Sequence, residues 1–169
     1  MKEENQEKKS KNYSILFLIS GIFIGILITI FTGWIMMPKM MITVHKSRYK
    51  TVEETCDNLK KSIIANGWSC PAVRNLNKAM NKHGVTLDKK VRIVELCKAN
   101  LAKEVLSTNP EVSTLMPCAW GVYKEKDGNV YISGMNMGIM GKIFGGNIAK
   151  VMGNNVATDE ERILKNIIE

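Results

Sequence analysis

The chain has 169 residues, of which 45% are hydrophobic and 24% are charged, and its 24 Lys and Arg against 16 Asp and Glu give a formal net charge of +8. This length excludes an assembly of several large domains, and this composition excludes a wholly disordered chain. The basic excess suits anionic lipid headgroups or acidic partners, but no array of basic and aromatic residues forms a stacking platform for bases, so no nucleic acid is expected as a partner.

An uncharged run from Ser14 to Met37 is the first feature along the chain. A helix of this length spans a hydrocarbon layer of about 30 Å. The run is longer than the apolar region of a cleaved signal peptide and does not end in small residues. We therefore expect an N-terminal tail at residues 1–13, one transmembrane helix at residues 14–37 and a single soluble domain at residues 38–169.

The orientation of this single-pass protein in the cell membrane follows from the short tail. A first helix most often leaves such a tail in the cytoplasm, and large following domains are translocated largely regardless of charge. Lysines flank the run almost equally on both sides, so the charge count alone leaves the orientation open. We expect the soluble domain to be extracytoplasmic.

Small residues recur every four positions within the uncharged run, at Gly21, Gly25, Thr29 and Gly33. On a helix they form one stripe along which a second helix can approach closely. This pattern predicts a homodimer paired through the membrane helix. Glycine is also frequent in unpaired membrane helices, so an unpaired helix is the alternative.

Hydrophobic periodicity predicts the elements of the soluble part in chain order. A strand within residues 41–49 is followed by a helix that Thr51 and Glu54 begin as a capping box and that Gly67 ends. Further helices are expected at 75–82, 99–107, 139–152 and 160–168, the last capped by Thr158, and strands at 91–97, 118–124 and 129–135. Consecutive hairpin strands with separate helices predict an α+β fold, in which an antiparallel sheet is packed with helices.

The hairpin between the last two strands sets a predicted register. Asp127-Gly128 between β-rich segments is a strong hairpin signal. A two-residue loop there places Trp120 opposite Met135 and Cys118 opposite Met137. Because strand side chains alternate, these four residues are expected on one face of the sheet.

Four cysteines are present, and no two of them form a CxxC pair. Cys56 lies on the apolar face of its predicted helix and is expected in the core. Cys97 ends a predicted strand with Glu95 on the same face, and Cys118 opens another strand. If these two strand ends are neighbours, thiols and thioethers meet at one edge of the sheet, and such sulfur ligands suit Cu(I).

The candidate ligands for a soft metal such as copper, a sulfur species or another small ligand are therefore Cys97, Cys118, Met137, Met135 and Glu95. Two alternatives stay open. The sulfurs form a methionine-rich core face without a ligand, or Cys97 and Cys118 form a disulfide in an oxidising compartment.

Signatures of known enzymes are absent from the sequence, which contains no GxSxG, HExxH, P-loop or GxGxxG motif. The sequence thus indicates no catalytic residue and requires no cofactor. The open functions are a membrane-anchored binding or accessory domain, a thiol–disulfide redox protein that uses Cys97 and Cys118, and a purely structural interaction domain.

A family resemblance extends over the soluble part from about Ile42 to Leu164. It is carried by a strand ending in ELC, a Pro-Cys that opens a strand, and the following Asp-Gly, Val-Tyr-Ile-Ser and Met-Asn, all within VRIVELCKANLAKEVLSTNPEVSTLMPCAWGVYKEKDGNVYISGMNMGIMG. These features resemble the bacterial and archaeal domain-of-unknown-function family 302. The resemblance implies a curved antiparallel sheet that grips helices, grouped with the TATA-binding-protein-like folds, and homodimers in some members. It implies no activity, and because many members lack these cysteines, a cysteine-based function would belong to a subgroup.

Overall fold

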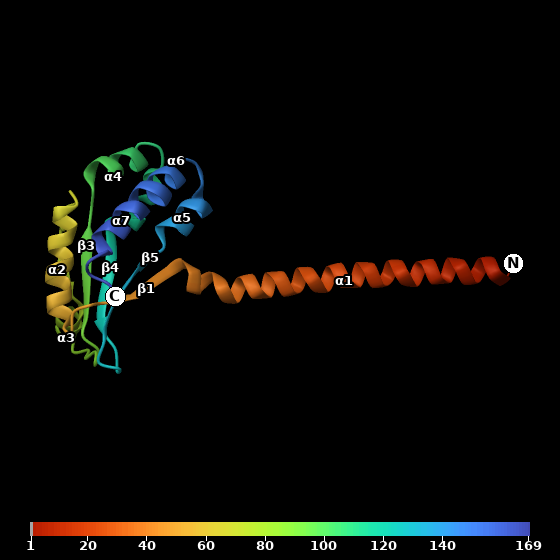
Figure 1. Ribbon diagram of the computed structural model, residues 1–169, viewed down its shortest axis with the longest axis horizontal. Coiled ribbons are helices and arrows are strands. Elements are labelled where there is room, and N and C mark those ends of the chain that lie inside the picture. The colour runs from red at the N-terminus through yellow and green to blue at the C-terminus, as the bar shows by residue number, and fades with distance from the viewer. Residues whose placement is uncertain (1) are drawn as a thin grey trace. The chain divides into compact units, whose positions relative to one another are not determined.

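The computed structural model describes residues 2–169, and the side chains of residues 2–16 and of Pro38 are outside that description. The chain divides into two compact units at Lys39 and Met40. Helix α1 (Lys2–Met41) occupies the first unit (Figure 1), so the expected tail is helical from Lys2 onward. Within α1, the 21 residues Phe17–Met37 are long and apolar enough to cross a membrane.

The second unit carries the predicted strands and helices together with two additions. Its elements are β1 (Ile42–Lys46), α2 (Val52–Ala65), β2 (Val73–Asn75), α3 (Leu76–Asn81), β3 (Val91–Leu96), α4 (Ala99–Leu106), the 3₁₀ helix η1 (Pro110–Leu115), β4 (Cys118–Lys124), β5 (Val130–Met135), α5 (Met137–Phe144), α6 (Gly146–Ile148), the π-helix η2 (Ala149–Val156) and α7 (Ala157–Leu164). Strand β2 and helix η1 are the additions.

The C-terminal helices differ from the prediction in where they begin and end. The helix expected at residues 139–152 is interrupted at Gly145 and Gly146, whose φ angles of +70° and +53° suit glycine. The chain then continues through α6 and η2 directly into α7, so the N-cap of α7 is Val156 and the predicted cap at Thr158 is wrong. Phe144, Ile148 and Val151 keep a helical spacing across Gly145 and Gly146, which is why the apolar pattern did not reveal that interruption.

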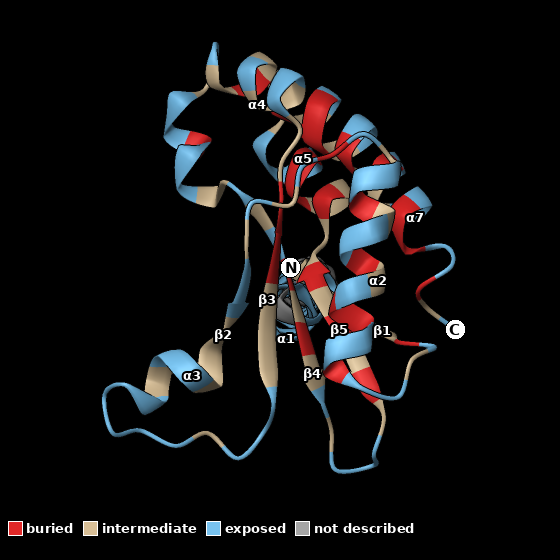
Figure 2. Ribbon diagram, turned by 90° about the vertical axis from the view of Figure 1, so that its left-hand side faces the viewer, coloured by how far each residue is buried: buried red, intermediate tan, exposed pale blue. Residues whose placement is uncertain are grey.

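The strands form one curved antiparallel sheet in the order β1-β5-β4-β3-β2. Helix α2 crosses in front of the sheet in Figure 2, with α7 beside it. Helix α2 contacts β3, β4 and α7. The α+β prediction of an antiparallel sheet packed with helices is therefore confirmed.

The core lies between this helix layer and one face of the sheet. Strands β4 and β5 bury alternate residues, Trp120 with Val122 and Val130 with Ile132. Helix α2 begins where predicted, because the Thr51 side chain accepts a hydrogen bond from the Glu54 N–H at 3.1 Å. Its buried positions are Val52, Thr55, Cys56, Leu59 and Ile63. The prediction that Cys56 is a core residue is confirmed, and burial raises the pKa of its thiol to about 11.

The register of the β4–β5 hairpin differs by one residue from the prediction. Trp120 pairs with Gly134 and Lys124 with Val130. The Glu125 N–H donates to the Asn129 carbonyl at 3.0 Å, so the loop contains three residues, Lys126–Gly128, instead of two. Gly128 takes the positive φ angle, +81°, that such a loop requires.

A one-residue shift of register turns every side chain of β5 to the other face. Gly134 rather than Met135 therefore shares the face of Trp120, and Met135 lies on the opposite face. Met137 belongs to α5, not to the strand, so the predicted pairing of Cys118 with Met137 is wrong. The hairpin itself and its position are as predicted.

The close approach of Gly134 to Trp120 leads to a testable prediction for residue 134. A Cβ atom on residue 134 would lie 2.3 Å from Trp120 Cδ1, so Gly134→Ala must displace a buried indole. We expect a loss of about 1–3 kcal/mol in the free energy of unfolding, measured by denaturant titration of the full chain in detergent micelles. Gly138→Ala is the control, because its Cβ would meet only Asn136 Oδ1 at 3.4 Å. Equal midpoints for the two variants would contradict the predicted clash.

Candidate functional site

A small apolar cavity of about 30 Å³ lies where β3 ends and β4 begins, beside α4 and η2. Four sulfur-bearing residues contribute to its lining, Cys97, Cys118, Met116 and Met152. Most of the remaining lining is aliphatic, and Trp68 and Lys98 complete one wall. The cavity therefore combines soft donor atoms with an environment that offers little to a water molecule.

Strand pairing brings the two cysteines to this cavity from distant parts of the sequence. Leu96, the last residue of β3, pairs with Cys118, the first residue of β4. Cys97 follows directly and exchanges backbone hydrogen bonds with Ser69, at 3.0 and 2.9 Å. Cys97 is thus held at the end of β3 by a second segment. Strand alternation puts Cys97 on the face of Glu95, so it contributes to the lining from the end of β3 and not from the face that carries Cys118. All four cysteines of the chain are free thiols.

The other three predicted ligands lie outside the cavity lining. Glu95 pairs with Ala119, so it lies on the face opposite Cys118, and Arg74 binds its carboxylate. Met135 lies on the face opposite Trp120. Met137 is a buried core residue at the start of α5.

Two methionines take the place that Met135 and Met137 had in the sequence prediction. Met116 lies just after η1, ahead of the Pro-Cys that opens β4. Met152 is a buried residue of η2. Met116 lies two residues before Cys118, so it could have been noticed in the sequence, whereas Met152 reaches the cavity only through the packing of η2.

Burial controls the chemistry of Cys118. It raises the pKa of this thiol to about 12, and the nearby Glu160 and Cys97 add to the effect when they are charged. At neutral pH the group is a thiol and not a thiolate. Thiolates are the nucleophiles in disulfide exchange, so Cys118 is a poor candidate for fast redox chemistry.

Glu160 is a second titratable group perturbed by burial. It lies four residues after Val156, which lines the cavity, and therefore on the same side of the continuous helix. Desolvation raises the pKa of its carboxyl group from 4.5 to about 8. The sequence prediction missed Glu160, which there looked like an exposed acid in the first turn of the last helix.

A hydrogen-bonded network around Asp159 holds Trp68, a lining residue of the cavity, in place. The Trp68 indole N–H donates to Asp159 Oδ2 at 3.0 Å, and Lys98 Nζ donates to the same oxygen at 2.7 Å. Arg162 also binds the carboxylate. Although burial opposes ionisation of Asp159, the hydrogen bonds from Lys98 and Trp68 keep its pKa below the usual range. The Lys98 ammonium also lies 5.7 Å from the Trp68 ring centre, so α7, Trp68 and Lys98 are tied together.

The cavity differs from a site for a hard or borderline cation. Among residues 17–37 and 39–169, whose side chains the structure describes, no group of three or more His, Cys, Asp and Glu side chains is placed to hold a metal ion. The sulfur atoms of cysteine and methionine are soft donors, which suit Cu(I) better than Mg²⁺ or Ca²⁺.

Comparisons with known proteins concern the second unit of the chain. The sequence profile of the family described as "Domain of unknown function DUF302" matches residues 43–169. The fold is similar to the crystal structure of an uncharacterized conserved protein DUF302 from Bacillus stearothermophilus, with a TM-score of 0.66 and 19% sequence identity over 75% of this chain and 98% of that chain. No curated protein is significantly similar in sequence.

The raised pKa of Glu160 predicts a pH dependence of stability. The folded chain keeps the proton that the unfolded chain releases near pH 4.5, so this contribution is complete below pH 4.5 and is lost as the pH rises toward 8. We expect wild-type stability to fall between pH 5 and pH 8 relative to that of Glu160→Gln, by an amount that unfolding of the full chain in micelles can measure. Parallel pH profiles for the two proteins would contradict burial of this carboxyl group.

Proposed function

Because the chain belongs to the DUF302 family, whose description names no activity, we propose a function from the chain's own site: a membrane-anchored binding domain that holds one soft metal ion, Cu(I), between Cys97 and Cys118. The binding role does not require catalysis, which agrees with the lack of catalytic motifs in the sequence. The observation that carries the proposal is the gathering of two thiols and two thioethers around one small cavity.

The size and polarity of the cavity support a single ion as its occupant. A volume of about 30 Å³ is close to that of one water molecule, but a buried water needs two to four polar partners. Sulfur atoms bind water weakly and Cu(I) strongly. Met116 and Met152 would complete a coordination shell that begins with the two cysteines.

The alternative of a thiol–disulfide redox protein receives less support from the same site. Rapid exchange needs an accessible thiol of low pKa, whereas the pKa of Cys118 is about 12. A high thiol pKa weakens metal binding as well, but a bound ion replaces the proton directly and does not depend on the thiolate being present beforehand.

The proposal also includes the cellular location of the protein and its oligomeric state. Residues 17–37 would anchor the protein in the cell membrane by a single pass, with the domain on the extracytoplasmic side. Two chains would pair along Gly21, Gly25, Thr29 and Gly33. This stripe suits close approach because Thr29 Oγ1 donates to the Gly25 carbonyl of its own helix at 2.9 Å, which leaves no unsatisfied hydroxyl on the surface.

Cu(I) titration of the full chain in detergent micelles tests the binding site. With reductant present and a colorimetric Cu(I) chelator as competitor, we expect about one ion per chain and at least about a tenfold loss of affinity in Cys118→Ser and in Cys97→Ser. Cys70→Ser is the matched control, because Cys70 is half-buried and lies outside the cavity lining. Equal affinities for Cys70→Ser and Cys118→Ser would refute the site.

The same titration at several pH values tests the assignment of Cys118. Binding must release the Cys118 proton at any pH below about 12. Each unit of pH increase should therefore tighten apparent binding by about tenfold for this one proton. Cys118→Ser should have a smaller slope than wild type, and an unchanged slope would mean that Cys118 is not a ligand.

Reporter fusions after Glu169 test the proposed orientation. A reporter that is active only outside the cytoplasm should be active, and one that is active only in the cytoplasm should be silent, because the short tail favours a cytoplasmic N-terminus. The opposite pattern would place the cavity in the cytoplasm. This result would not contradict the Cu(I) proposal, but it would refute the proposed extracytoplasmic location.

A further inference from the structure

Helix α5 ends in two adjacent exposed apolar residues, Ile143 and Phe144, which are 51% and 49% exposed. The opposite side of the helix is buried through Met137, Met140 and Gly141. Phe144 is also the one phenylalanine that lies C-terminal to the apolar segment. Because its neighbours Gly145 and Gly146 turn the chain with positive φ angles, Phe144 lies at the tip of the helix.

Covalent connection limits how far this helix can lie from the end of the apolar segment. The N–H of Asn136, the N-cap of α5, donates to the Met41 carbonyl at 2.8 Å. Met41 follows Met37, the last residue of the apolar segment, by four residues. Even fully extended, four residues reach only about 14 Å. The headgroup layer extends about 5–8 Å beyond the hydrocarbon on each side, so the start of α5 is confined to the neighbourhood of a bilayer that the segment spans.

Other exposed apolar residues lie at the same covalent position. Met40, Ile42 and Val44 follow the apolar segment directly and are 50–58% exposed. Ile42 pairs with Met135, the residue before Asn136, so the start of β1 and the start of α5 are adjacent. Apolar exposure in the domain thus continues from the tether to α5.

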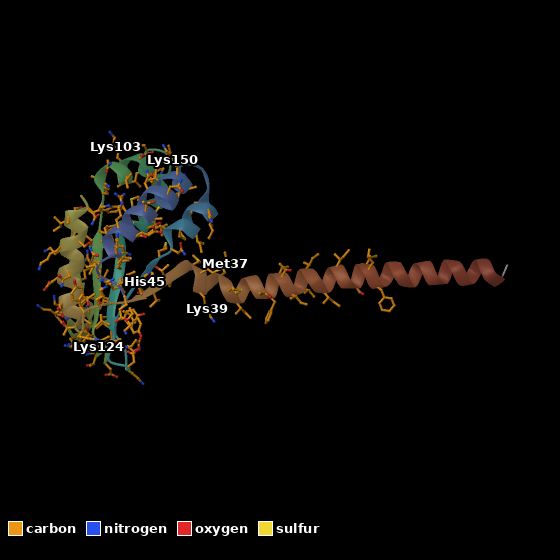
Figure 3. All side chains as sticks on the ribbon, in the orientation of Figure 1. Met37, Lys39, His45, Lys103, Lys124 and Lys150 are labelled. Carbon is orange, nitrogen blue, oxygen red and sulfur yellow. The ribbon has the colours of Figure 1, made fainter. Side chains whose placement is uncertain are left out.

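Charged side chains of both signs lie near α5. Lys142 and Lys150 line a groove beside the helix together with Glu161. Lys150 also pairs with Glu104 at 3.2 Å. Lys150 and Lys103 lie at one end of the domain, and Lys124 at the other (Figure 3).

We propose that Ile143 and Phe144 of α5 insert into the interfacial layer of the bilayer that anchors the chain, and that they dock the domain on the membrane surface. This docking rests on the membrane anchoring proposed above and is independent of the metal site. Aromatic and aliphatic side chains at a helix end are favoured at this depth, and Lys142 beside them can keep its ammonium group in water. Because insertion depends on the apolar side chains, docking persists at high salt.

Tryptophan quenching by lipids brominated on their acyl chains tests this docking in nanodiscs that hold the full chain. The probe is Phe144→Trp. The emission that it adds is the difference between the tryptophan emission of this variant and that of wild type. The control is Val85→Trp, because Val85 is 55% exposed in the loop after α3, and α3 lies at the end of the domain away from α5 (Figure 2). We expect about twofold or greater quenching of the emission that Phe144→Trp adds and none of the emission that Val85→Trp adds. Combining Ile143→Asp with Phe144→Trp should abolish the quenching.

Each other outcome overturns the docking in a distinguishable way. Suppose that the emission added by Phe144→Trp is unquenched, while wild-type emission, which comes from Trp34, Trp68 and Trp120, is quenched through Trp34 inside the bilayer. This result would refute the docking and leave the anchor intact. If the unquenched added emission were also blue-shifted, the indole would be covered by a protein partner instead of lipid. Wild-type emission that no brominated lipid quenches would refute the anchor and the docking together.

Discussion

The antiparallel pairing of β3 with β4 is the contact on which the rest of the domain depends. These strands lie side by side in the sheet, with β2 and β5 on their outer sides. Their pairing places Val94 beside Trp120 in the core and ends with Leu96 beside Cys118. The core and the cavity are therefore consecutive parts of one ladder, and a shift of register would move both at once.

The chemistry of the cavity is set by burial and not by a charged motif. The same low-polarity surroundings raise the pKa of Cys118 to about 12 and that of Glu160 to about 8, so both groups are neutral at pH 7. The one ionised acid nearby, Asp159, stays charged because Lys98 and Trp68 donate hydrogen bonds to it. The Cys118 thiol is thus neutral, and the Asp159 carboxylate is compensated by its hydrogen-bond partners.

The two proposals use different parts of the same domain. The sulfur cavity lies where β3 ends and β4 begins, whereas the start of α5 is hydrogen-bonded through Asn136 to Met41, four residues after the apolar segment. Helix η2 connects them, since it packs against α5 and also supplies Met152 to the cavity. The contact with α5 is close, because a Cβ on Gly141 would lie 2.6 Å from the Gly153 Cα. Attachment of α5 to a bilayer would therefore restrain a helix that forms one wall of the metal site.

The sequence by itself determined the elements whose signals are local. The apolar segment, the Thr51 cap of α2, the burial of Cys56 and the presence of a hairpin at Asp127-Gly128 each depend on neighbouring residues, and the structure has all of them. Only the tertiary structure decided the hairpin register, because two-residue and three-residue loops around Asp-Gly differ by a single position that side-chain pattern does not report. That position removed Met135 from the face of Trp120, and Met137 belongs to α5. Met116 lies only two residues before Cys118, but Met152 and the perturbed acid Glu160 reach the site through the packing of helical segments, and such contacts between distant residues leave no spacing in the sequence.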